Sequence, residues 1–178
     1  TKLDHEFRLP GIPTPALAIS PDGKSIATDR SGNRDMVQIR EASSGKLQFS
    51  LKTKIDVHHD TLTFSFSPSG RYLLMPRHVW DLEGPKVVWE EPTVDRFVAT
   101  SNRWTSRGAG WAWDDEHIVV ACDGRYTLWN WPKNERLVTF AFLPDSNWVA
   151  LNHQNGHWTG SRNLHRYVQF QQGAAKTA

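Results

Sequence analysis

A threefold internal repeat is the feature that most constrains the fold of this 178-residue chain. Aligning the repeats places Ile19, Phe66 and Trp113 at equivalent positions, and the steps from 19 to 66 and from 66 to 113 are both 47 residues. A period in the forties is typical of four-stranded repeat units. The segments around these residues alternate large and small side chains, as strands with one packed face do; they are residues 16–23, 63–70 and 110–115.

Each repeat continues with three further predicted strands. The opening strand is followed by a turn, Pro-Asp-Gly in the first repeat and Pro-Ser-Gly in the second, and such residues supply the φ values that a tight turn needs. We find no window of 11 or more residues with a sustained helical apolar pattern, so the prediction is all-β. The later strands are predicted at 25–28, 37–41 and 45–51, at 72–75, 78–82 and 85–89, and at 118–121, 126–130 and 135–140.

The repeats resemble the bacterial WD40 repeat. The turn at residues 20–23 and the stretch 37–46 carry the resemblance, and Trp80-Asp81 stands where the family has its Trp-Asp dipeptide. The first repeat has Arg40-Glu41 at that place and the third has Trp129-Asn130, and the Gly-His signature of the family is missing from all three. The resemblance covers roughly residues 5–170. It implies a WD40-like β-propeller built from blades of four antiparallel strands.

The resemblance also implies how the chain is divided. We expect an incomplete ring of about three to four blades that forms the C-terminal portion of a longer protein, because so short an arc leaves apolar blade faces exposed. The remaining blades would come from the missing N-terminal part or from another chain. A compact ring of about four blades is the alternative. The expected parts are an outer strand of a preceding blade at 1–14, blades at 15–54, 61–92 and 108–142, a final partial blade at 143–170, and a flexible tail at 171–178.

Composition excludes several classes of protein. Charged residues make up 22% of the chain and the formal net charge is +2, so the dispersed Lys and Arg residues do not indicate a nucleic-acid partner. No apolar run approaches the length of a membrane span, so membrane insertion is not expected. The single cysteine, Cys122, excludes an internal disulfide framework. The sequence leaves the compartment open, with the cytoplasm slightly favoured.

The histidines are the first candidates for chemistry. His153 and His157 have an i, i+4 spacing that could hold zinc on a helix, but the residues between them predict a turn. His58, His59 and Asp60 form a dense cluster in the connection into the second blade, where they either brace the loop or form a ligand or catalytic site. We find no Gly-x-Ser-x-Gly elbow, Walker loop or Gly-x-Gly-x-x-Gly. The prediction is therefore a non-enzyme with no metal and no cofactor.

Seven of the nine tryptophans fall into two groups. Trp104 lies between Arg103 and Arg107 in the long connection at 96–107, and aromatic and arginine residues are enriched at interface hot spots. These three residues, together with the 58–60 cluster, are the candidate binding residues, although an aromatic folded back onto a blade would explain Trp104 equally well. Six tryptophans are expected on strands that pack between blades: Trp80, Trp89, Trp111, Trp113, Trp129 and Trp148.

The function that follows is a protein–protein interaction scaffold. Within the family, bacterial WD40 arrays serve as regulatory or sensory modules attached to kinases, proteases or conflict-type effectors, and the resemblance implies a protein partner of that kind. One alternative is a small-molecule or glycan sensor that uses exposed Trp and Arg residues. Another is a metal-dependent catalytic propeller with a histidine site.

Overall fold

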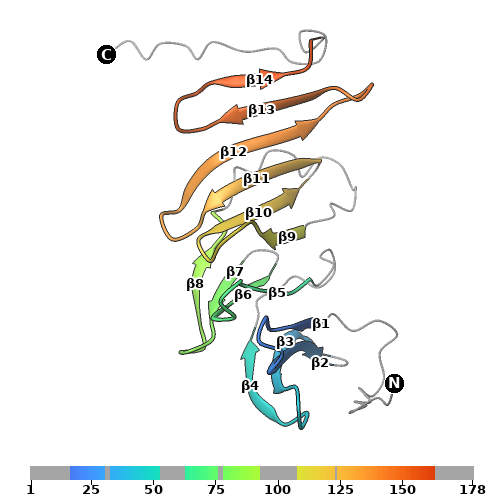
Figure 1. Cartoon of the computed structure of the whole chain (residues 1–178), viewed down its shortest axis with the longest axis vertical. Coiled ribbons are helices and arrows are strands. Elements are labelled where there is room, and N and C mark those ends of the chain that lie inside the picture. The colour runs from blue at the N-terminus through green and yellow to red at the C-terminus, as the bar shows by residue number, and fades with distance from the viewer. Residues whose placement is uncertain are drawn as a thin grey trace.

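The computed structural model describes residues 17–30, 33–52, 63–75, 78–92, 108–122 and 124–162. Over these ranges the protein is all-β, as predicted. Fourteen strands form three antiparallel sheets of four, four and six strands, with no helix and no closed barrel among the described residues. Figure 1 shows the sheets following one another along the long axis. No described segment forms a helix with the length and apolar character needed to cross a membrane.

Each sheet pairs its strands in chain order, so every connection within a sheet is a hairpin. The first sheet contains β1 (Leu17–Ile19), β2 (Ser25–Arg30), β3 (Asn33–Glu41) and β4 (Leu47–Lys52). The second contains β5 (Ser65–Phe66), β6 (Tyr72–Met75), β7 (His78–Asp81) and β8 (Lys86–Glu90). The third contains β9 (Gly108–Trp111), β10 (His117–Cys122), β11 (Arg125–Asn130), β12 (Glu135–Phe142), β13 (Trp148–Asn152) and β14 (Trp158–Gly160).

One backbone hydrogen bond closes the turn after the first strand in all three sheets. The residue following that strand donates its backbone N–H to the carbonyl of the first residue of the second strand, five positions on. The three bonds run from Ser20 to Ser25 (2.9 Å), from Ser67 to Tyr72 (2.8 Å) and from Ala112 to His117 (2.9 Å). This shared bond fixes which residues of the three sheets are equivalent.

These hydrogen bonds show that the sequence alignment placed the third repeat two residues out of register. Ile19 and Phe66 precede the equivalent turn residues, and in the third sheet that place belongs to Trp111 rather than Trp113. The prediction that Trp113 packs between units is wrong, because it lies in the turn with 65% of its surface exposed. Both tryptophans fit a large–small alternation, so periodicity alone did not separate them.

A β-bulge also recurs at one place in every sheet. The register between the third and fourth strands shifts between Ile39 and Arg40, between Val79 and Trp80, and between Leu128 and Trp129. A bulge bends its strand and increases the local twist. The alignment of Arg40-Glu41 and Trp129-Asn130 with Trp80-Asp81 is therefore confirmed by backbone geometry.

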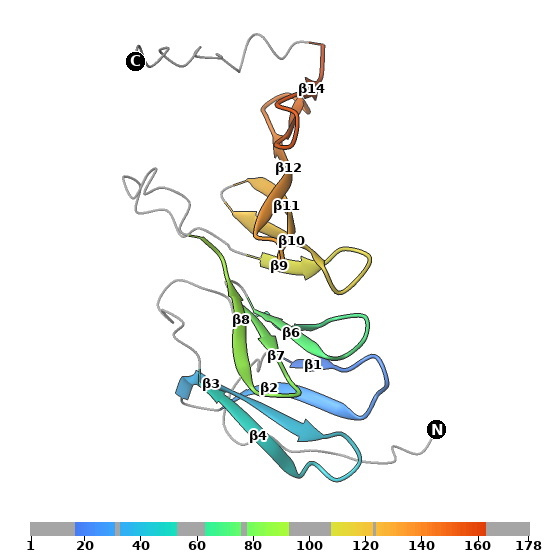
Figure 2. The same ribbon diagram turned by 90° about the vertical axis from the view of Figure 1, so that its left-hand side faces the viewer.

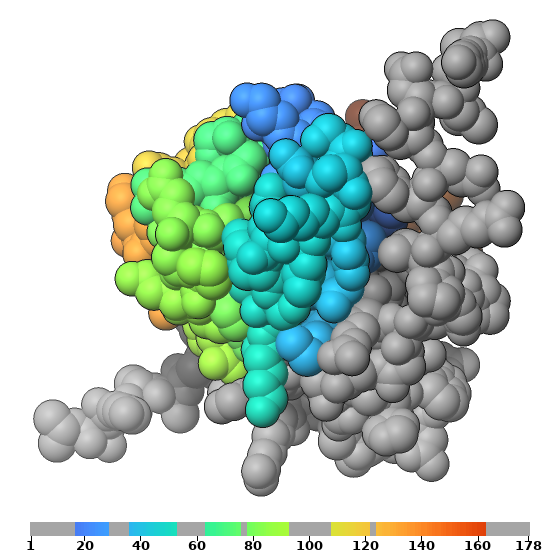
Figure 3. Space-filling view, turned by 90° about the horizontal axis from the view of Figure 1, so that it is seen from below, coloured from blue at the N-terminus to red at the C-terminus, as the bar shows by residue number. Residues whose placement is uncertain are grey.

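Two apolar clusters join the three sheets, and the second sheet is covered on both faces (Figure 2). One face carries Leu73 and Met75 against the first sheet, and the other carries Leu74 and Val79 against the third; each is at most 1% exposed. Seen from below, the first sheet, in blue and cyan, and the second, in green, pack side by side (Figure 3). The expected burial of three tryptophans is confirmed; they are Trp80, Trp89 and Trp129.

The last two strands continue the third sheet, whereas we expected residues 143–170 to begin a final partial blade. β12 is eight residues long and hydrogen-bonds to β11 on one edge and to β13 on the other. β11 pairs with residues 135–141 of β12, and β13 pairs with residues 138–142 along the opposite edge, where β14 then pairs with β13. The expected parts at 1–14 and 171–178, and residues 163–170, lie outside the described residues.

Candidate functional site

The binding residues expected from the sequence lie in two connections between sheets. His58, His59 and Asp60 belong to the connection from β4 to the second sheet, and the second connection joins β8 to β9. All six candidates lie outside the described residues; the other three are Arg103, Trp104 and Arg107. The candidate site below is therefore built from other residues.

Four aromatic side chains lie on one face of the third sheet, and we call them the aromatic face: Tyr126, Phe140, Phe142 and Trp148. The strand register places them together, because Tyr126 pairs with Phe140 and Phe142 pairs with Trp148. Paired residues of neighbouring strands point to the same side of a sheet, as do residues two apart on one strand. Three strands, β11, β12 and β13, therefore present one continuous group of rings.

The rings of the aromatic face contact one another. The centroid of Phe140 lies 4.8 Å from that of Phe142 in an edge-to-face arrangement and 5.5 Å from that of Trp148 in a stacked one. Tyr126 meets Phe142 edge-on at 6.0 Å. Phe142 is nevertheless 64% exposed and Tyr126 43% exposed. Clustered exposed rings of this kind mark interaction surfaces more often than a single surface aromatic does.

The aromatic face lies on the side of the third sheet turned away from the second. The side chains that pack against the second sheet include Ile118, Val120 and Trp129, and the register places these on the opposite side from Tyr126 and Phe140. The third sheet therefore has one face in a core and one apolar face, and no other sheet of the described residues packs on that second face. We call it the open face.

A second feature is the turn between β9 and β10. The Trp113 ring stacks on the His117 imidazole with centroids 4.8 Å apart. His117 Nδ1 lies 2.9 Å from Asp114 Oδ1, and its Nε2 lies 3.5 Å from Asn130 Nδ2. Partial desolvation raises the pKa of Asp114, but hydrogen bonds from His117 and from the backbone N–H groups of Glu116 and His117 outweigh it and lower that pKa overall. Both imidazole nitrogens thus face groups that brace the turn.

The histidine pair at 153 and 157 lies in the turn of the β13–β14 hairpin, as predicted. His153 Nε2 is 2.8 Å from Thr139 Oγ1. Burial lowers the pKa of His153, and the positive charge of Arg136 lowers it further. Across the described ranges, no group of three or more His, Cys, Asp or Glu side chains is placed to hold a metal ion.

Sequence reasoning missed most of the aromatic face. Trp148 was assigned to packing between blades, and Tyr126, Phe140 and Phe142 were not singled out. The available signal was the alternation of apolar residues at 138, 140 and 142, which continues past the predicted end of the fourth strand.

No protein-family model matches the chain, and no curated protein matches it. The repeated geometry of the three sheets therefore supplies the basis for a functional proposal.

Proposed function

We propose that this chain is a non-catalytic segment of a WD40-like β-propeller that acts as a protein-interaction scaffold, without metal or cofactor. Its aromatic face docks a further β-sheet of the same kind. That sheet belongs to the rest of a parent protein or to a partner protein. The proposal rests on one observation, the open apolar face of the third sheet.

Equivalent positions support this role. In the first sheet, Ala27 and Ile39 face the second sheet, and in the second sheet Leu74 and Val79 face the third. The equivalent residues of the third sheet are Val119 and Leu128, which lie on the side of the aromatic face. In the first and second sheets, this face packs against the next sheet along the chain. In the third sheet, the equivalent face is the aromatic face.

The first sheet, at the other end of the molecule, exposes the opposite face. Leu17 and Ile19 are 54% and 57% exposed. Their equivalents in the second sheet, Phe64 and Phe66, are buried against the first sheet. One end thus presents a face for a following sheet and the other a face for a preceding sheet. Such a pair of different, complementary surfaces is heterologous and allows head-to-tail stacking.

A second copy of the chain can stand in for the missing sheet, because it carries the complementary face. We expect the wild-type chain to associate as its concentration rises. A lysine at either open face buries a charge in the interface, so Ile19→Lys and Phe142→Lys should each remain at the mass of one chain. An equimolar mixture of the two variants should form a heterodimer, because each variant keeps one intact face. Light scattering coupled to size-exclusion chromatography measures these masses.

The matched control is Trp113→Lys, which adds the same charge at an equally exposed aromatic outside both faces; its association should match that of wild type. A wild-type chain that stays at single-chain mass at all concentrations would contradict the proposal. A mixture that fails to pair while wild type self-associates would show that the contact does not join these two faces.

A further inference from the structure

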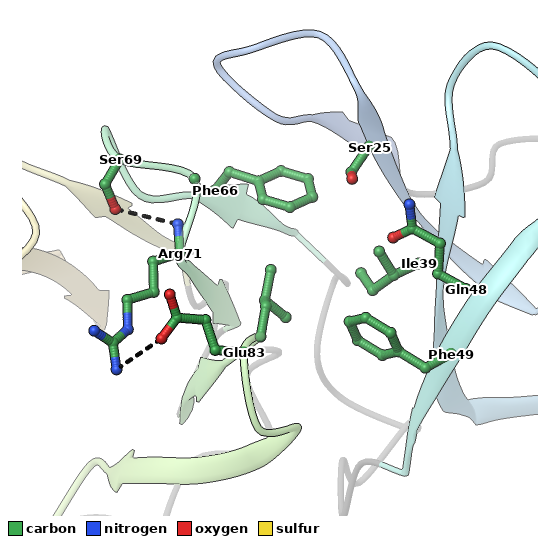
Figure 4. A pocket seen from close by; sticks show the side chains of 10 residues that line it. Ser25, Ile39, Gln48, Phe49, Phe66, Ser69, Arg71 and Glu83 are labelled. Carbon is green, nitrogen blue, oxygen red and sulfur yellow. Dashed lines mark hydrogen bonds and ion pairs between the residues drawn. The ribbon is translucent and has the colours of Figure 1, made fainter.

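A pocket of about 350 Å³ lies between the first and second sheets. Figure 4 shows Ile39 and Phe49 entering it from the first sheet and Phe66 from the second. Ser25 and Gln48 line the side of the first sheet, and the remaining lining residues belong to the second; they are Ser69, Gly70, Arg71, Leu82 and Glu83. The pocket therefore has apolar walls and polar groups around them.

In the contact between the second and third sheets, aromatic rings stand at the positions equivalent to the pocket lining. The Tyr72 ring lies edge-on to Trp131 with centroids 5.2 Å apart and lies 6.4 Å from the Trp111 ring. The nearby Trp89 ring packs edge-on against Trp129 at 5.7 Å. The positions equivalent to Ser25, Phe49, Phe66 and Leu82 of the pocket are thus held by four large side chains, Tyr72, Trp89, Trp111 and Trp131.

Among these equivalent positions, the side chains differ most in size at two. Ser25 is the equivalent of Tyr72, because both begin the second strand and accept the same turn hydrogen bond. Leu82 is the equivalent of Trp131, since their backbone N–H groups donate to the carbonyls of Arg71 (3.0 Å) and Glu116 (3.0 Å), which hold equivalent positions. The pocket is therefore the volume left by the absence of a tyrosine and an indole ring.

The lining of the pocket carries one positive and one negative side chain, Arg71 and Glu83, and Asp81 lies behind Arg71. Arg71 Nη2 lies 2.9 Å from Asp81 Oδ2 and 3.3 Å from Glu83 Oε2, so its positive charge is paired. Gln48 and Ser25 add neutral donors and acceptors. A charged ligand gains little from such a lining, whereas a neutral ring with a hydroxyl group fits both the walls and the surrounding groups.

We propose that this pocket binds a tyrosine side chain of a partner peptide, which takes the place that Tyr72 occupies in the neighbouring contact. The proposal rests on the proposed role in protein interaction and adds a second site to it. The phenol ring packs between Phe49 and Phe66, and its hydroxyl group meets the polar groups around the pocket.

The test uses the Phe142→Lys chain, in which stacking through the aromatic face is blocked, so that the pocket is examined by itself. The probe is a capped pentapeptide, Gly-Gly-Tyr-Gly-Gly, titrated at millimolar concentration while amide resonances are followed by NMR. We expect saturable shifts at Gln48, Gly70 and Glu83. The same peptide with alanine in place of tyrosine should produce shifts at least tenfold smaller.

Two variants fill the pocket with the side chains found in the neighbouring contact. Ser25→Tyr and Leu82→Trp should each weaken peptide binding at least tenfold and leave the chain folded. Because two variants fill the pocket independently, the test still gives a result if one of them fails to fold. Ser43→Tyr is the matched control, because Ser43 is exposed in the β3–β4 turn, and it should bind as the parent does. Equal shifts with the alanine peptide, or unchanged binding in a folded pocket-filling variant, would overturn the proposal without bearing on the aromatic face.

Discussion

Asp81, the acidic member of the Trp-Asp dipeptide, links two strands of the second sheet through its side chain. Its Oδ2 accepts a hydrogen bond of 2.9 Å from Arg71 Nη2, and its Oδ1 accepts one of 3.0 Å from the backbone N–H of Glu83. The hydrogen bond from Arg71 lowers the pKa of Asp81, against an opposing effect of burial. The same contact raises the pKa of Arg71. The carboxylate therefore stabilises the folded state in its charged form.

Asp81→Asn should lower the free energy of unfolding at pH 7 by about 1 kcal/mol, because it removes the charged partner of Arg71 and keeps the shape of the side chain. A carboxyl group whose folded pKa is depressed stabilises the fold above its unfolded pKa and loses that effect as the pH falls through the folded value. The difference between wild type and variant should thus shrink from about pH 4 downward. Urea unfolding at several pH values measures it.

The control for this prediction is Glu116→Gln, an exposed carboxylate in the turn before β10. It should change the unfolding free energy by less than about 0.5 kcal/mol. A gap between Asp81→Asn and wild type that is the same at pH 7 and at pH 3 would count against a charge effect.

At the scale of single elements, the turn after β11 carries the residue that closes the contact between the second and third sheets. Trp131 is 7% exposed, and its Nε1 donates a hydrogen bond of 2.6 Å to the carbonyl of Asp115. Trp113, in the neighbouring turn, is 65% exposed. The two tryptophans stand 18 positions apart and differ in burial, so they form a natural pair for mutation.

Trp131→Leu should destabilise the chain by about 2–3 kcal/mol, because it removes a buried ring and leaves a cavity like the one beside Leu82. Trp113→Leu should cost less than about 0.5 kcal/mol. Guanidinium unfolding followed by circular dichroism compares the two variants. Equal losses would mean that the rings are packed alike, contrary to the structure.

The sequence predicted individual strands and turns better than any other feature of the fold. Turn residues such as Pro21 and Gly23 and the alternating strands around them were sufficient to place most strands of the three sheets. The register of the third repeat was missed because Trp111 and Trp113 fit the same alternation, and a backbone hydrogen bond at Ala112 decides between them. The pocket was beyond sequence reasoning, because it appears when Ser25 is compared with Tyr72 across two contacts.

At the scale of the whole molecule, the three sheets differ in how well they are covered. The middle sheet packs on both faces, while each outer sheet has one open face, as Leu17 and Phe142 show by their exposure. A sheet covered on both sides loses more apolar contacts when it opens than a sheet covered on one side does.

Amide hydrogen exchange should therefore be slowest in β6 and β7 and fastest in β1 and β14. Protection should fall by at least tenfold from the middle sheet to either end. Exchange measured by NMR on the Phe142→Lys chain avoids protection that arises from association. Uniform protection across the fourteen strands would indicate that the sheets open together rather than one by one.

The bulge that recurs before Arg40, Trp80 and Trp129 has a consequence for how such a chain can evolve. Since each sheet carries this irregularity between the same two strands, the strand pairing repeats from one sheet to the next. A tandem duplication or deletion of one whole repeat, 45 to 47 residues by the spacing of Ile19, Phe66 and Trp111, joins sheets that share the same strand pairing. Lineages can thus gain or lose repeats in a single genetic event, and the two different spacings within this chain show that the length of one repeat can change while the strand pairing of the next is kept.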